Sequence, residues 1–296
     1  MKVAVLIISY NFERWLTRCL DSLRHSTLRP EVYVVDNAST DQSVTRIRHH
    51  YPEVHLTCST ENLGFGRANN LAAQQALADG ADFLCLLNQD AWVDYNTLET
   101  LCSFSTVLPK YGILSPTHLN GAGDRLEKGF ASYTQKNALE VSTSQEPLIE
   151  APFINAACWL VPAVVWRKVG GFCPLFYHYG EDVDFVNRLH YHGYRVGWSP
   201  CVTACHDRDQ RPQTHAAFLH SEWVWLLAEY ANINRSLPSA FAYSVLAALK
   251  KAMKATVHAQ IKDACAFIGM SMKLLAQSRA LFAYRKNNKT GNCEYQ

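Results

Sequence analysis

The first hundred residues alternate short apolar runs with stretches of helical periodicity, and this alternation limits the possible folds more than any other feature. The runs VAVLII, VYVV, VHLTC and FLCLL occupy residues 3–8, 32–35, 54–58 and 83–87. Between them, residues 15–23 place their apolar side chains on one helical stripe. Buried strands that alternate with helices are typical of a parallel sheet covered on both faces. The sequence therefore predicts a mainly parallel, doubly wound α/β fold.

The pattern changes after residue 114. Residues 115–150 form a long polar segment, which we predict to be a functional or mobile loop. Apolar runs return at about residue 154, and the chain is predicted to be strongly helical from residue 213 to about residue 285.

Polar side chains follow three of the predicted strands. They are Ser9, Tyr10 and Asn11 after the first strand, Asp36 and Asn37 after the second, and Asn88, Gln89 and Asp90 after the fourth. Ligands of an open parallel sheet bind beyond the carboxyl ends of its strands. One such group is explained by a turn or a helix cap, but three at one edge predict a ligand crevice.

Residues 62–70, NLGFGRANN, are a candidate phosphate-binding loop. Gly64 and Gly66 would let the backbone approach a ligand closely, and Arg67 could pair with a phosphate. The segment departs from the dinucleotide-binding fingerprint, because it ends in asparagine and follows the third strand when it should follow the first. Ordinary turn chemistry explains the glycines almost equally well, so both interpretations stay open.

Residues 180–185, GEDVDF, place three acids in the first turn of a predicted helix. Acids at a helix N-terminus are stabilised by the helix dipole, which explains them without any function. Asp182, however, lies three and seven residues before the apolar Phe185 and Leu189, so we expect its side chain to face a sheltered surface. A sheltered carboxylate has a raised pKa and can act as a general base.

Taken together, these motifs resemble the glycosyltransferases of family 2, which have the GT-A fold, and in particular the bacterial rhamnosyltransferase-like group. The resemblance covers about residues 1–210 and rests on SYN, DNASTD, ENLGFGRANN, LLNQDA and GGF…YGEDVDFVNRL…GYRVGW in this order. It implies a catalytic domain over residues 1–212, with a nucleotide-sugar half to about residue 114 and an acceptor half after it. Residues 213–296 would form a basic helical extension.

The resemblance also implies a role for each polar position. The residues that it places around the nucleotide sugar are Ser9, Tyr10, Asn11, Asp36, Asn37, Asn62, Arg67, Asn88, Gln89 and Asp90. Asp90, the last residue of a degenerate DxD motif, and His206 would hold a divalent cation, Mg²⁺ or Mn²⁺. Asp182 would be the general base, and Glu181 would orient the acceptor.

The implied reaction moves a sugar, with inversion, from a dTDP- or UDP-linked donor to a saccharide or lipid-linked acceptor in the assembly of cell-surface polysaccharide. The sugar would be rhamnose-like, galactose or a hexosamine. Two alternatives stay open. A nucleotidyltransferase would normally carry a loop rich in glycine and basic residues directly after the first strand, where this chain has SYNFERW. A non-catalytic nucleotide-sugar-binding protein would not require the Glu181-Asp182 pair.

Cysteine usage and charge bear on location and partners. Ten scattered cysteines, no signal-peptide pattern and no uncharged apolar stretch of ~18 residues predict a cytoplasmic protein. Residues 215–296 hold 10 Lys+Arg and 4 Asp+Glu, net +6, against a net −4 for residues 1–214. Without a recognition motif, this charge does not predict nucleic-acid binding. Residues 239–285 predict an amphipathic helix that packs on the catalytic domain or in a homodimer, or that contacts the inner face of the membrane.

Overall fold

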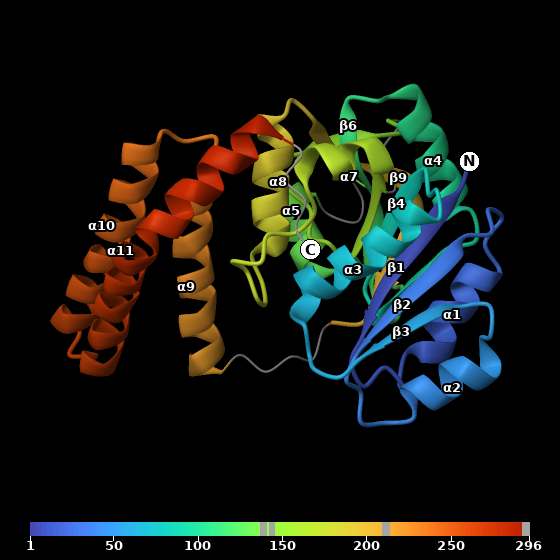
Figure 1. Cartoon of the computed structure of the whole chain (residues 1–296), viewed down its shortest axis with the longest axis horizontal. Helices are drawn as coiled ribbons and strands as arrows, with labels where there is room; N and C mark the ends of the chain where they lie inside the picture. Colours follow the sequence, from blue (N-terminus) through green and yellow to red (C-terminus); the bar gives the residue numbers. More distant parts are fainter. Residues whose placement is uncertain (137–140, 142–145, 209–213, 292–296) are drawn as a thin grey trace.

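The computed structural model describes residues 1–136, 141, 146–208 and 214–291 of the 296-residue chain. Figure 1 shows an α/β body built on one twisted sheet and, beside it, a group of long helices from the C-terminal part of the chain. The predicted domain boundary at residue 212 lies outside the described residues.

Within the described residues, a nine-stranded sheet has the order β3-β2-β1-β4-β8-β6-β9-β5, and β7 pairs with β9. The strands are β1 (Val3–Ser9), β2 (Glu31–Asn37), β3 (His55–Ser59), β4 (Phe83–Leu87), β5 (Ala91–Val93), β6 (Tyr111–Asn120), β7 (Ile149–Ala151), β8 (Cys158–Pro162) and β9 (Arg195–His206). The four strands of the first half, β3-β2-β1-β4, are parallel, as predicted. The second half is mixed, because β8 is antiparallel to both β4 and β6.

Helices cover both faces of this sheet. They are α1 (Leu16–Arg24), α2 (Ser43–His50), α3 (Gly64–Ala78), α4 (Thr97–Val107), α5 (Lys128–Thr134), α7 (Ala163–Val169) and α8 (Glu181–Tyr191). Alternate residues of β1 divide the core, since side chains of a strand point to opposite faces. Ala4 and Leu6 pack with α3, α7 and α8, whereas Val5 and Ile7 pack with α1, α2 and α4.

The prediction of a loop over residues 115–150 is wrong in part. The segment contains the second half of β6, helix α5 and strand β7, and residues 137–140 and 142–145 lie outside the described residues. The end of β6 is polar but buried, and its side chains find hydrogen-bond partners inside the protein. Ser115 Oγ donates to Cys158 O at 2.9 Å, and Thr117 Oγ1 donates to Ser199 O at 3.1 Å. These bonds allow a polar strand to lie in the interior.

The C-terminal part of the chain forms three helices, α9 (His215–Ala231), α10 (Leu237–Val257) and α11 (Ile261–Thr290). They join the body through an apolar cluster in which Phe176 from the loop before α8 packs with Leu226, Tyr230 and Tyr284. None of the described helices combines the length and apolarity needed to cross a bilayer.

Candidate active site

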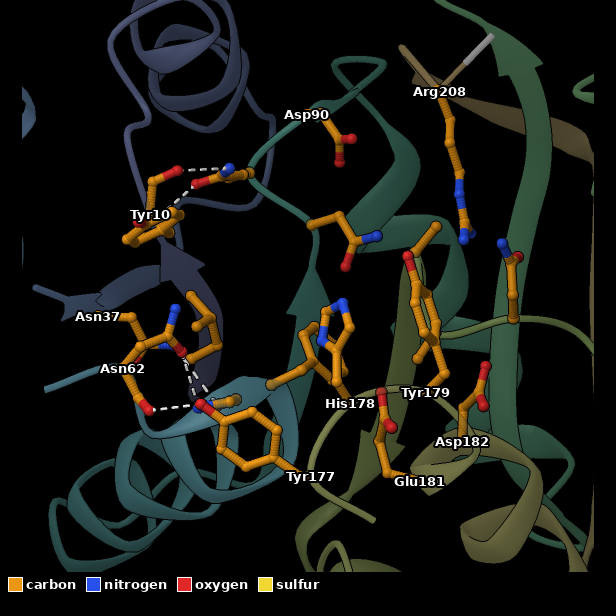
Figure 2. Close-up of a pocket in the computed structure, with 18 of the residues that line it drawn as sticks. Tyr10, Asn37, Asn62, Asp90, Tyr177, His178, Tyr179, Glu181, Asp182 and Arg208 are labelled. Carbon is orange, nitrogen blue, oxygen red and sulfur yellow. Dashed lines mark hydrogen bonds between the residues drawn. The ribbon is translucent and has the colours of Figure 1, made fainter. Parts of the chain in front are cut away.

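A cavity of about 640 Å³ lies at the carboxyl ends of β1, β2 and β4, the sheet edge at which the sequence predicts a ligand crevice. Predicted site residues from five separate segments line it (Figure 2). These are Tyr10, Asn37, Asn62, Asn88, Gln89, Asp90, Glu181 and Asp182. The fold therefore brings most of the predicted positions to one space.

Two hydrogen-bonded units build the wall of the cavity nearest β1 and β2. Tyr10 N–H donates to Gln89 Oε1 at 2.8 Å, and Gln89 Nε2 donates back to Tyr10 O at 3.1 Å. This reciprocal pair ties the ends of β1 and β4 together while the Tyr10 ring stays 48% exposed. Asn62 Oδ1 accepts the N–H of Gly64 at 2.9 Å, and Asn37 Nδ2 donates to Gly64 O at 3.4 Å.

Four predicted nucleotide-binding residues lie outside the lining of the cavity, Ser9, Asn11, Asp36 and Arg67, as does the predicted metal ligand His206. Asp36 is buried and accepts hydrogen bonds from Ser9 Oγ at 2.7 Å and from Ser39 N at 2.9 Å. Asn11, in the left-handed region at φ 51°, accepts the N–H of Thr40 through its side chain. Ser9, Asn11 and Asp36 thus hold the loops behind the cavity in place. Arg67 is exposed on α3. Contact of these four residues with a nucleotide stays a prediction.

The candidate phosphate loop is mostly helical, because α3 begins at Gly64. A Cβ on Gly64, where φ is +78°, would lie 2.4 Å from Tyr177 O. A Cβ on Gly66 would lie 3.1 Å from Phe172 Cβ. Packing against residues 172–177 therefore requires glycine at position 64 and favours it at position 66, so the two glycines do not by themselves indicate a phosphate.

Asp90 and His206 meet because β5 pairs antiparallel with β9, which places Ala91 opposite His206. Asp90 Oδ1 lies 3.3 Å from His206 Nε2, and Asn88 Nδ2 lies 3.3 Å from the same nitrogen. Asp90 and His206 are 3% and 1% exposed. One carboxylate and one imidazole suit a Mn²⁺ or Mg²⁺ ion that takes its other ligands from water and phosphate. Among the described residues, no three His, Cys, Asp or Glu side chains gather to hold a metal alone.

Glu181 and Asp182 open helix α8, directly after Gly180 at φ 87°. Glu181 is 6% exposed, and its Oε2 atom is buried with no hydrogen-bond partner among the described residues. Burial and the negative charge of Asp182 raise the pKa of Glu181 to about 8. Burial also raises the pKa of Asp182, against the opposing effects of the Val183 N–H and the positive charge of Arg208. The sheltered carboxylate expected from the sequence is thus present, and it belongs to a pair.

Several residues that line the cavity were not predicted from the sequence. Arg208 is the only arginine or lysine among the described lining residues, and its guanidinium carbon lies 5.9 Å from the centre of the Tyr179 ring. Tyr179 has φ 68°, and such backbone strain is found mainly at functional sites. Arg208 lies two residues after His206, a predicted metal ligand, and this position could have identified it from the sequence. Tyr179 and its neighbour Tyr177 gave no signal except their position before the GED motif.

Helix α9 also contributes to the cavity, although the sequence separates it as an extension. His220 lines the cavity, and its Nε2 lies 2.9 Å from His178 O. A Cβ on Gly180 would lie 2.5 Å from Val224 Cγ1, so α9 packs directly against the turn that precedes Glu181. The C-terminal helices are therefore part of the site.

Comparison with known proteins agrees with this geometry. The family model for glycosyl transferase family 2 matches residues 4–161, and that for glycosyl transferase family group 2 matches residues 83–254. An N-acetylglucosaminyl-diphospho-decaprenol L-rhamnosyltransferase from Mycobacterium tuberculosis is 27% identical over 256 residues, which span 76% of this chain and 83% of the relative.

Solved structures share the fold at low sequence identity. S. aureus TarS 1-349 in complex with UDP-GlcNAc has a TM-score of 0.57 at 17% identity, covering 98% of this chain and 89% of that chain. The mannosyltransferase PcManGT from Pyrobaculum calidifontis, in complex with GDP-Man and Mn²⁺, has a TM-score of 0.60 at 20% identity, covering 97% and 83%. These likenesses confirm the predicted GT-A fold.

Proposed function

The chain belongs to glycosyl transferase family 2 and is a glycosyltransferase, and we propose that it transfers a sugar with inversion from a nucleotide diphosphate sugar to a lipid-linked saccharide. One observation carries this proposal: a single cavity holds Asp90 beside His206 and also holds the carboxyl pair at the start of α8. Figure 2 shows Asp90 and the Glu181–Asp182 pair reaching this cavity from different sides. A donor diphosphate and an acceptor hydroxyl can therefore bind side by side in this cavity.

The two carboxyl groups suit different tasks. With a pKa of about 8, Glu181 is mostly protonated at neutral pH and can donate a hydrogen bond to the acceptor. Asp182 then accepts the proton of the attacking hydroxyl, since a general base must be ionised before it acts. Neighbouring acids whose environments separate their pKa values commonly divide their roles in this way. Attack from the side of Asp182, opposite the leaving diphosphate, inverts the anomeric carbon.

The leaving group needs positive charge, and the chain offers two sources. Asp90 and His206 would hold a divalent cation, which neutralises charge on the departing diphosphate. Arg208 would add a permanent charge and hydrogen bonds to phosphate oxygens, because its planar guanidinium matches them in geometry. With asparagine at position 88, the DxD motif lacks one carboxylate, so the arginine compensates for a weakly held ion.

The donor and the acceptor are proposed from the relatives. The M. tuberculosis relative is named for rhamnose transfer to a diphospho-decaprenol-linked acceptor. We accordingly expect a dTDP- or UDP-linked rhamnose-like sugar, galactose or hexosamine as donor, and a role in polysaccharide assembly at the cytoplasmic face. The nucleotidyltransferase and non-catalytic alternatives lose support, because the matching family consists of glycosyltransferases.

A donor screen with the full-length protein tests this function. We would incubate it with dTDP-rhamnose, UDP-galactose or UDP-GlcNAc, a diphosphate-linked lipid acceptor and Mn²⁺, and measure nucleoside diphosphate release and product mass. Asp182→Asn is the control for catalysis. We expect nucleoside diphosphate release that depends on the acceptor and is lost in the variant. NMR couplings at the anomeric centre of the product should show a configuration opposite to that of the donor. Tight nucleotide binding without turnover of any donor would overturn the proposal, and a retained configuration would overturn the mechanism.

A further inference from the structure

Helix α10 buries small side chains and exposes several large apolar ones, which is the reverse of an ordinary soluble helix. Its buried face consists of small side chains, Ala240, Ser244, Ala248, Ala252 and Ala255. Phe241 and Val245 pack against the neighbouring helices, but four other large apolar side chains point to solvent: Leu246, Leu249, Met253 and Val257 are exposed by 61%, 44%, 65% and 78%. These four residues are spaced by three, four and four positions, so they form one stripe along the helix.

Helix α11 repeats this arrangement. Its exposed large apolar residues include Ile261, Ile268, Met272 and Leu275. These residues recur at spacings of seven, four and three, so they also share one face. We call the four residues of α10 and these four of α11 the outer stripes. Single exposed apolar side chains are normal on soluble proteins, but contiguous rows mark an interaction surface.

The charge of the hairpin indicates what this surface binds. Residues 237–290 hold nine lysines and arginines against a single acid, Asp263, a net charge of +8. The exposed Lys250, Lys254 and Lys262 each directly follow a residue of the outer stripes. They lie at the borders of the stripes, where a lysine can bury its carbon chain and keep its ammonium in water. Apolar stripes bordered by lysines are typical of helices that lie in an anionic lipid interface.

We infer that the outer stripes of α10 and α11 bind an anionic membrane surface. The inference rests on the proposed function insofar as a membrane would carry the lipid-linked acceptor. A second copy of the chain fits less well, since two surfaces bordered by exposed lysines would repel each other on contact. Figure 1 shows α10 and the first half of α11 on the side of α9 that faces away from the sheet.

Vesicle flotation with the full-length protein tests the inference. Wild-type protein should float with vesicles that contain anionic phosphatidylglycerol, fail to float with pure phosphatidylcholine, and be released as salt rises. Met253→Gln/Val257→Gln should abolish flotation. Lys250→Gln/Lys254→Gln should weaken it roughly 10- to 30-fold, since each basic residue near an anionic surface contributes a factor of about three to five.

A matched control exists on the α/β body. Val107 and Val164 are 75% and 68% exposed, so Val107→Gln/Val164→Gln removes the same kind of surface elsewhere and should float like wild type. The inference fails if wild type does not bind anionic vesicles, or if the stripe variant and the control bind equally. It also fails if sedimentation shows a wild-type dimer that the stripe variant makes monomeric. Nucleoside diphosphate release with a water-soluble acceptor should be unchanged in every variant, so a failure of the proposed function is measured separately.

Discussion

Replacing Glu181 by glutamine should make the protein more stable and less active. Glu181 is buried, and one of its oxygens has no hydrogen-bond partner among the described residues. Glutamine has nearly the same shape and remains neutral at every pH. The substitution therefore removes the free-energy cost of ionising a buried acid. The amide replaces only in part the hydrogen bond that we propose Glu181 donates to the acceptor.

The size of this effect follows from the pKa of Glu181, which rises from 4.5 to about 8 in the folded protein. Between these two values the folded protein holds the proton and the unfolded chain releases it. The folded state thus binds more protons, so the free energy of unfolding falls as pH rises, by about 1.4 kcal/mol per pH unit. At pH 7 the accumulated cost is on the order of 3 kcal/mol. Below about pH 4.5 the wild type and the variant should be equally stable.

Urea unfolding at pH 5, 6, 7 and 8 measures this difference between Glu181→Gln and the wild type. The gain in unfolding free energy should grow with pH and level off near pH 8. In an Asp182→Asn background the gain should be smaller and level off at a lower pH, because removing the neighbouring negative charge lowers the pKa of Glu181 toward its unfolded value. Glu61→Gln, an exposed control in the loop before α3, should change little. A difference that is the same at pH 5 and pH 8 would refute the account of Glu181.

Three further changes test the catalytic assignments. Asp182→Asn should lower turnover by roughly 10²- to 10⁴-fold with nucleotide affinity near wild type in calorimetry, and near-normal turnover would transfer the base role to Glu181. Asp90→Ala and His206→Ala should each weaken Mn²⁺-dependent binding of the nucleoside diphosphate, whereas activity that persists in excess EDTA would argue for a metal-free mechanism. Arg208→Ala should weaken diphosphate binding by roughly 10- to 100-fold, as expected for the loss of a charged hydrogen bond. Arg208→Lys should restore part of this affinity. Equal affinity of the wild type and both variants would show that Arg208 does not bind the donor.

The parallel half of the sheet was predictable because β1, β2 and β4 are buried on both faces and therefore appear as unbroken apolar runs. The second half was not, and β6 shows why. Ser115 and Thr117 look like loop residues in the sequence, yet their hydroxyl groups bond to carbonyl oxygens of Cys158 and Ser199. Partners that lie 43 and 82 residues away cannot be found from local periodicity.

The candidate site divides in the same way. Strand-end polarity predicted Tyr10, Asn37 and Asp90 because a rule of the fold places them at one edge. Arg208 and His220 come from segments far along the chain, and only the packing of β9 and α9 against that edge brings them to the cavity.

Helix α11 also contacts the first turn of α8, which carries the catalytic pair, and this contact affects how membrane binding should be tested. Asp184, in the first turn of α8, pairs with Arg188 at 2.9 Å and accepts a hydrogen bond from the Tyr284 hydroxyl of α11. Because this buried contact fixes the turn that carries Glu181 and Asp182, losing Tyr284 would disturb both carboxyl groups. A chain cut after residue 212 would thus lose catalysis and vesicle binding together, whichever surface binds lipid. Substitutions on the outer stripes leave the contact of Tyr284 with Asp184 in place, so they separate the two effects.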